Sequence, residues 1–201
     1  MSDVYDLTMS THPVVYLTGA PATGKTSVAE YLRDVHKARI FSYGRALSEH
    51  AALRGATHEE LRQHSSKIVT AEVVADLDAS LPMLLAEWRQ HQPVIIDSHA
   101  VTSESWGLRA LPYGIESLRA VGITRIICLI ADGETLLARI RSSPGGRRPE
   151  DAWKLDQLNN TQLALAAAYA HTLAIGASAI DARAPLEEVC RAVASRCALD
   201  A

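Results

Sequence analysis

The 201-residue sequence lacks most features of secreted, membrane-bound or nucleic-acid-binding proteins. Its only cysteines are Cys128, Cys190 and Cys197, with no Cys-x-x-Cys pair, which excludes a disulfide framework and a four-cysteine zinc site. It has no run of about 18 apolar residues, and residues 1–12 lack the basic and apolar regions of a signal peptide. We therefore expect a cytoplasmic protein with no membrane partner. The net charge of −3 argues against direct binding of nucleic acid.

Hydrophobic residues make up 48% of the chain, enough for a substantial core. Short aliphatic segments alternate along it with segments of helical periodicity. Strands are expected at residues 13–18, 39–43, 93–97, 123–130 and 177–182, with helices between them and a loop at 98–111. This alternation predicts an α/β fold, a five-stranded parallel sheet with helices on both faces.

Residues 19–26, Gly-Ala-Pro-Ala-Thr-Gly-Lys-Thr, match the pattern GxxxxGK[ST] between a predicted strand and a predicted helix. In this context the motif is a P-loop, although a plain glycine-rich turn is the alternative. Its backbone N–H groups surround nucleotide phosphates, Lys25 bridges the β- and γ-phosphates, and the Thr26 hydroxyl ligates Mg²⁺. The cofactors that we predict are ATP and Mg²⁺. The predicted cofactor-binding residues are Gly19, Ala20, Pro21, Ala22, Thr23, Gly24, Lys25, Thr26 and Ser27, together with Arg139.

Asp97 ends the strand Val-Ile-Ile-Asp, and ligands of parallel sheets bind beyond the carboxyl ends of the strands. We therefore expect Asp97 to hold Mg²⁺ together with Thr26, although an Asp that only opens a loop is the alternative. His99 lies two residues further on and could orient a water, accept a proton or bind the acceptor. A purely structural histidine is equally compatible with the sequence.

Arginines surround the Pro-Gly-Gly sequence of residues 144–146. Arg139, Arg141, Arg147 and Arg148 there suggest a mobile lid that neutralises a transferring phosphoryl group. A solvated basic helix end is the alternative. Further arginines could contact an anionic acceptor, namely Arg45, Arg62 and Arg109.

Taken together, these motifs resemble the archaeal-type adenylate kinases and their CINAP-type relatives in ribosome maturation. The resemblance runs from about residue 13 to 182. It rests on the P-loop, Ser42-Tyr-Gly-Arg45, Leu61-Arg62, Asp97-Ser-His99, the sequence Ala-Asp-Gly-Glu-Thr-Leu-Leu-Ala-Arg that ends at Arg139, and the Arg147-Arg148 pair. Ala22 replaces a usual glycine, and the helix after the lid carries Asn159-Asn160-Thr161-Gln162 without an arginine.

The resemblance implies one P-loop kinase domain, with a core at residues 13–43, 91–141 and 151–201, a helical acceptor-binding insertion at about 44–90, and a lid at about 142–150. It implies ATP as donor and a nucleoside monophosphate, AMP first, as acceptor. The site residues that it implies are Tyr43, Gly44 and Arg62 by the acceptor, Asp97 and His99 by metal and phosphates, and Arg139 and Arg148 over the transferred group. Residues 182–186 would lie near the adenine of ATP.

Three functions follow from these residues. The leading one is phosphoryl transfer from ATP to a nucleoside monophosphate, catalysed by Lys25, Asp97, His99, Arg139 and Arg148. The second is a kinase for a hydroxyl of a sugar or other small metabolite, in which Asp97 or His99 takes the hydroxyl proton. The third is a CINAP-type ATPase that acts on a macromolecular partner.

Overall fold

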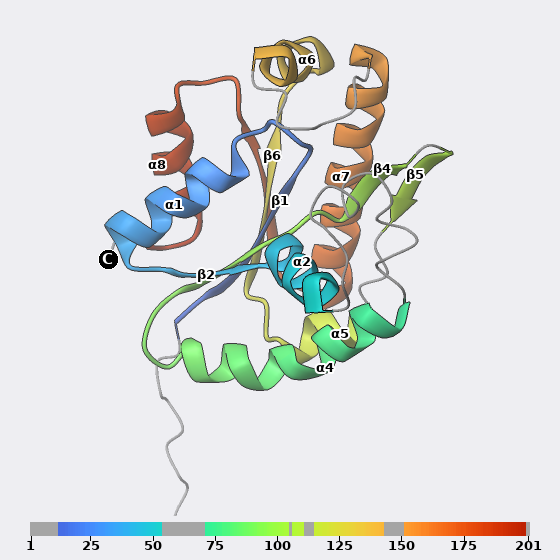
Figure 1. Cartoon of the computed structure of the whole chain (residues 1–201). Helices are drawn as coiled ribbons and strands as arrows, with labels where there is room; N and C mark the ends of the chain where they lie inside the picture. The colour runs from blue at the N-terminus through green and yellow to red at the C-terminus, as the bar shows by residue number, and fades with distance from the viewer. Residues whose placement is uncertain (1–11, 54–70, 105, 111–114, 143–150, 200–201) are drawn as a thin grey trace, which may run out of the picture.

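Helices and strands alternate along the chain in the computed structural model, which describes residues 12–53, 71–104, 106–110, 115–142 and 151–199 (Figure 1). The strands are β1 (Val14–Gly19), β2 (Arg39–Ser42), β3 (Val94–Asp97), β4 (Val101–Glu104), β5 (Gly107–Ala110), β6 (Arg125–Ile130) and β7 (Gly176–Asp181). The helices are α1 (Lys25–His36), α2 (Tyr43–Leu53), α4 (Ala71–Trp88), α5 (Ile115–Ala120), α6 (Gly133–Ser142), α7 (Ala152–Leu173) and α8 (Leu186–Arg196).

Five strands form one parallel sheet in the order β2-β3-β1-β6-β7. The register pairs Asp97 of β3 with Leu17 of β1 on one side and with Ser42 of β2 on the other. The carboxyl ends of these three strands therefore meet at one edge of the sheet, where ligands of α/β proteins bind. The predicted α/β fold with a five-stranded parallel sheet is confirmed.

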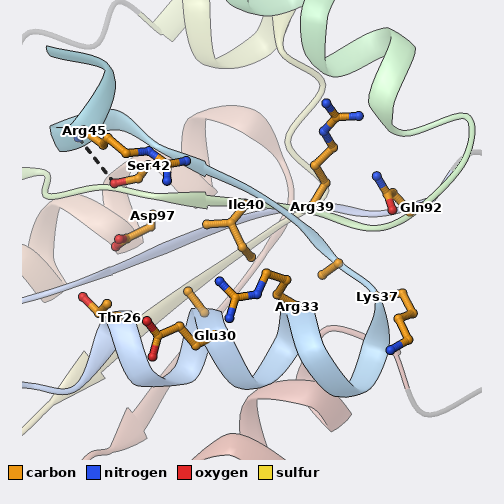
Figure 2. Close-up of a pocket in the computed structure, with 12 residues that line it drawn as sticks. Thr26, Glu30, Arg33, Lys37, Arg39, Ile40, Ser42, Arg45, Gln92 and Asp97 are labelled. Atoms are coloured by element: carbon orange, nitrogen blue, oxygen red, sulfur yellow. Dashed lines mark hydrogen bonds between the residues drawn. The ribbon is translucent and has the colours of Figure 1, made fainter. Parts of the chain in front are cut away.

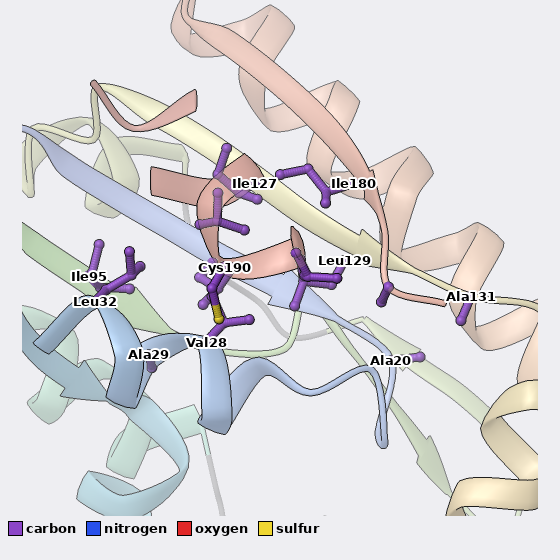
Figure 3. Packing of buried hydrophobic residues seen from close by; sticks show 14 of the residues in the cluster. Ala20, Val28, Ala29, Leu32, Ile95, Ile127, Leu129, Ala131, Ile180 and Cys190 are labelled. Carbon is purple, nitrogen blue, oxygen red and sulfur yellow. The ribbon is translucent and has the colours of Figure 1, made fainter. Parts of the chain in front are cut away.

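Both faces of the sheet are covered by helices. α1 and α8 pack together on one face, while α4, α5 and α7 lie on the other (Figure 1). Alternate residues of β1 point to opposite faces: Val15 and Leu17 join the core under α1 and α8, and Val14 and Tyr16 join the core under α4 and α7. Figure 3 shows part of the first core, including Val28 of α1 and Cys190 of α8. Within the described residues, no helix has the length and apolar character needed to cross a membrane.

The segment after β3 departs from the sequence-based expectation. Residues 98–111 were expected to be a loop, but β4 and β5 form an antiparallel hairpin there, with Val101 paired to Ala110 and Glu104 to Gly107. A two-stranded ribbon needs support from packing. β4 receives it from α7, which contacts this strand.

Parts of the predicted acceptor-binding insertion and lid lie outside the described residues. These are residues 54–70 of the insertion and 143–150 of the lid. In the described part of the insertion, α2 and α4 pack against each other, and α2 also contacts β2 and β3. The domain boundaries stay a prediction.

Gly133, the first residue of α6, allows α6 and α7 to approach closely. A Cβ atom at Gly133 would overlap the backbone carbonyl of Ala152, and the Gly133 N–H donates to Asp156 Oδ1 at 2.6 Å. We expect Gly133→Ala to lower the free energy of unfolding by about 1–3 kcal/mol, as overpacking does. Urea denaturation measures this.

The matched control for that substitution is Gly44→Ala in α2, where an added Cβ would meet no described atom within 4 Å. Because alanine is the better helix former, this variant should be as stable as the wild type or slightly more stable. Equal stability of the Gly133 variant and the wild type would contradict the close approach of α6 and α7.

Candidate active site

The segment between β1 and α1 follows a strained backbone path. Gly19, Ala22 and Gly24 have φ values of 149°, 66° and 91°. A Cβ on Gly19 would lie 2.6 Å from the carbonyl oxygen of Leu129, so the position accepts only glycine. An alanine with positive φ costs of the order of 1–3 kcal/mol and persists where the surrounding structure imposes the shape. Turns of this kind present successive N–H groups to an anion.

The N-terminus of α1 opens on this turn. Gly24 is the N-cap residue, and no side chain in the described part of the chain caps the helix there. The first turn, Lys25-Thr26-Ser27, carries no acidic residue that would occupy the positive end of the helix dipole. Backbone and dipole thus combine in the anion-binding arrangement that the motif predicts.

Lys25 is a buried cation within this turn. Its side chain bends back so that Nζ donates to the carbonyl oxygens of Gly19 at 2.7 Å and Ala20 at 3.4 Å, and the residue is 7% exposed. A buried ammonium group must be paired or hydrogen-bonded. These carbonyls hold the positive charge inside the P-loop.

Asp97 lies at the end of β3, close enough to Lys25 for their charges to interact. Burial raises the pKa of the Asp97 carboxyl, and the Lys25 ammonium partly offsets this rise. Asp97 and Thr26 line one end of a groove of about 620 Å³ between α1 and β2, beside Ser42 and Arg45 (Figure 2). The structure therefore brings together the two predicted metal ligands.

The groove continues from that end along α1 and the outer edge of β2. Glu30 and Arg33 of α1 line its middle, and Lys37, Arg39 and Gln92 line the far end (Figure 2). The Arg39 guanidinium stacks on the Trp88 ring, 3.9 Å from its centroid. This stacking holds one cation of the groove in place.

His99 contacts the P-loop directly. Its Nδ1 lies 3.0 Å from the carbonyl oxygen of Gly19, which also accepts from Lys25. Because a carbonyl oxygen can only accept a hydrogen bond, Nδ1 carries the proton in this contact. His99 is thus brought to the same carbonyl as the P-loop lysine.

Arg139, on α6, joins the P-loop to the chain after β7. Its two terminal nitrogens donate to the carbonyl oxygens of Ala22 at 3.3 Å and Ala182 at 2.8 Å. The half-buried guanidinium therefore lies beside the P-loop turn and beside the segment that the resemblance places near adenine.

Comparison with known proteins agrees with this geometry. The family model AAA_18, described as an AAA domain, matches residues 15–160. The chain belongs to this family. It is 26% identical over 163 residues to an adenylate kinase of Pyrococcus abyssi, covering 78% of this chain and 80% of that protein. It is 28% identical over 155 residues to an adenylate kinase of Thermoplasma acidophilum, covering 76% and 80%.

Solved structures show the same fold. A gluconokinase from Sinorhizobium meliloti superposes with a TM-score of 0.55 at 19% identity, covering 94% of this chain and 92% of that one. A sugar kinase from Janibacter sp. gives a TM-score of 0.54 at 16% identity, covering 94% and 96%. The predicted P-loop phosphotransferase of adenylate-kinase type is confirmed, and it binds nucleotide.

Only one of the other predicted site residues of this P-loop kinase lines the groove among those that the structure describes. Arg45 lines the groove, whereas Tyr43 is buried and donates from its hydroxyl to Asp78 Oδ1 at 2.6 Å. Gly44, the next residue of α2, is exposed. Arg109 lies on β5 and does not line the described groove. Arg62, Arg147 and Arg148 lie outside the described residues.

Sequence reasoning missed one polar residue of this site and most of the groove. Gln162 of α7 is fully buried and hydrogen-bonds to both β1 and the segment after β3. The only signal in the sequence is its position: Gln162 occurs on the apolar face that Leu155, Leu158 and Ala166 define. A buried amide on such a face must have partners.

Proposed function

We propose that this P-loop kinase transfers the γ-phosphoryl group of ATP·Mg²⁺ to a nucleoside monophosphate, with AMP as the first candidate. The observation that supports this most is the groove that begins at Thr26 and Asp97. Its volume of about 620 Å³ is suited to a nucleotide-sized ligand. Three arginines line it, Arg33, Arg39 and Arg45, which suits an acceptor that carries about two negative charges.

The donor end has groups suited to ATP and Mg²⁺. The P-loop turn and Lys25 would bind the phosphates, with Thr26 and Asp97 as the protein ligands of the metal. Among the described residues, no cluster of three or more His, Cys, Asp or Glu forms a metal site. That agrees with Mg²⁺, which keeps several waters and uses only one or two protein carboxylates. When bound, Mg²⁺ neutralises charge on the phosphates.

The roles proposed for the remaining residues follow from their contacts. His99, held by Gly19, would contact the transferred group or the acceptor. Arg139, held by Ala22 and Ala182, would lie beside the donor nucleotide, and Arg148 would close over the transferred group. The acceptor would be contacted by Arg45, with Tyr43, Gly44, Arg62 and Arg109 as the other predicted acceptor residues. Transfer would then rest on positioning and charge neutralisation.

A panel of acceptors tests this proposal. ADP production from ATP·Mg²⁺ is measured with AMP, CMP, UMP, GMP, their deoxy forms, and no acceptor. We expect a strong signal that depends on one monophosphate. ADP release without any acceptor would instead favour an ATPase that acts on a macromolecular partner, and no release would contradict the nucleotide kinase.

Arg45 provides a sharper test of the acceptor class. Its exposed guanidinium makes a weak ion pair, with Nε 3.8 Å from Glu49 Oε1. Little interaction energy is therefore lost when the guanidinium leaves Glu49 to bind a phosphate. We expect Arg45→Ala to raise KM for the monophosphate roughly 10- to 100-fold, the worth of one charge-assisted hydrogen bond, with KM for ATP unchanged. Steady-state kinetics with each substrate varied measures both.

The matched control is Arg119→Ala on α5, an exposed arginine that also pairs with a glutamate of its own helix, Glu116, at 2.7 Å. It does not line the described groove, and its KM values should equal those of the wild type. If KM for the monophosphate is also unchanged in the Arg45 variant, the acceptor phosphate is not bound in this groove.

The raised pKa of Asp97 supports a second candidate function. A carboxylate with a raised pKa is a better base for a hydroxyl proton, as a kinase of a sugar or small metabolite requires. That activity would depend on Asp97 or His99 and would be indifferent to Arg45→Ala. Adding small polyols and sugar acids to the acceptor panel separates the two functions.

A further inference from the structure

Gln162 is a buried polar residue beside the site, and the proposed function gives it no role. It lies in the middle of α7 and is 0% exposed, on a helix face that is otherwise aliphatic except for the buried Asn159. Burial of an amide costs free energy unless hydrogen bonds replace those to water. Its partners therefore indicate what it does.

Those partners belong to two segments that are far apart in sequence. Gln162 Oε1 accepts from the backbone N–H of Ala100 at 2.9 Å and of Val101 at 3.3 Å, and from the Thr18 hydroxyl at 3.1 Å. Gln162 Nε2 donates to the carbonyl oxygen of Val101 at 2.8 Å. One side chain thus joins the end of β1 to the chain that leaves β3.

Two further contacts fasten the same segment to β1. The backbone N–H of Ser98 donates to the carbonyl oxygen of Leu17 at 3.1 Å, and that of Ala100 lies 3.3 Å from the Thr18 hydroxyl oxygen. Between these points lies His99, whose Nδ1 contacts the Gly19 carbonyl. The direction of the His99 ring therefore depends on where residues 98–101 are held.

We propose that Gln162 is a positioning residue for phosphoryl transfer, which holds residues 98–101 against β1 so that Asp97 and His99 face the P-loop. The role in phosphoryl transfer rests on the proposed function. The positioning of residues 98–101 by Gln162 is a property of the folded chain and does not depend on it. An apolar residue of the same size would fill the space but would leave two N–H groups and one carbonyl without this partner. The segment would then shift, and small shifts of reacting groups are costly in rate.

Gln162→Leu tests the proposal in the full-length protein. We expect kcat to fall roughly tenfold, since misplacement of about 1 Å can cost more than that. KM for ATP and for the acceptor should change less than about twofold, because the P-loop and the groove bind them. Leu165→Ala is the matched control: this half-buried residue of α7 packs on the same core but makes none of these hydrogen bonds.

Two readouts are independent of activity. Long-range ¹H–¹⁵N spectra of the histidine rings should show the Nδ1–H tautomer of His99 in the wild type and in the Leu165 variant, and a mixture in Gln162→Leu. Amide hydrogen exchange at Ala100 and Val101 should accelerate in Gln162→Leu alone. Unchanged spectra and exchange in that variant would overturn the inference, whatever the enzyme transfers.

Gln162→Glu separates positioning from simple packing. Its carboxyl keeps the accepting oxygen, and burial against the Val101 carbonyl favours the protonated form, which restores the donor. The ratio of variant to wild-type kcat should therefore rise as the pH falls from about 8 to about 6. The proposal would be contradicted if the kcat ratio of Gln162→Glu to wild type stayed constant with pH. It would also be contradicted if Leu165→Ala lost as much kcat as Gln162→Leu. If the wild type transfers no phosphoryl group, the proposed function is contradicted. The histidine spectra and the amide exchange rates would then still test whether Gln162 positions residues 98–101.

Discussion

Replacing Lys25 with alanine is expected to lower kcat for phosphoryl transfer roughly 10³-fold, the loss typical of a buried group that stabilises transition-state charge. The ammonium group is already desolvated and held by the carbonyls of Gly19 and Ala20. Reorganisation of this charge during the reaction is therefore small, which is the condition under which electrostatic stabilisation is largest. Rapid-quench measurement of ADP formation at saturating ATP measures the loss.

The same substitution has a second expected effect, on Asp97. The Lys25 ammonium lowers the pKa of the Asp97 carboxyl against the effect of burial, so its removal should raise this pKa further. The acid side of the pH dependence of kcat should then move to higher pH. The matched control is Lys154→Ala, which removes an exposed lysine of α7 and should leave kcat unchanged. A Lys25 variant that keeps kcat within about threefold of wild type would contradict the assignment.

The fold could be predicted where the signal is local. The strands β1, β3 and β6 are aliphatic runs buried on both faces, and the helices between the strands have clear apolar faces, so the five-stranded sheet followed from the sequence. The hairpin β4–β5 could not, because each strand has four residues and faces partly outward. Its stability depends on α7, which lies about 60 residues later in the chain.

The candidate site divides in the same way. The P-loop with Lys25 directly follows β1, and Asp97 is the last residue of β3. A sequence motif therefore locates the first, and the end of a predicted strand locates the second. Tyr43 differs, because the contact that directs its hydroxyl away from the groove is with Asp78, 35 residues later. Gln162 was missed because its partners are backbone groups 61 and 62 residues away, which no motif records.

Asp97→Asn is expected to make the protein more stable and less active. The carboxyl is buried at the end of β3, and burial raises its pKa in the folded protein. An acid with a raised folded-state pKa destabilises the protein above that pKa, because the ionised form is better solvated in the unfolded chain. The asparagine variant avoids this cost. Its melting temperature at neutral pH should therefore exceed that of the wild type.

The sign of the effect fixes its pH dependence. As the pH falls through the raised pKa of folded Asp97 towards the ordinary value of 3.8, the wild type becomes protonated and the stability advantage of the variant should vanish. Thermal unfolding of both proteins across this range measures the convergence. Meanwhile kcat should fall roughly 10²–10³-fold, because an amide cannot supply the negative charge that holds the metal. A variant that is less stable than the wild type at neutral pH, or equally active, would show that Asp97 is held by a structural contact and not kept for its charge.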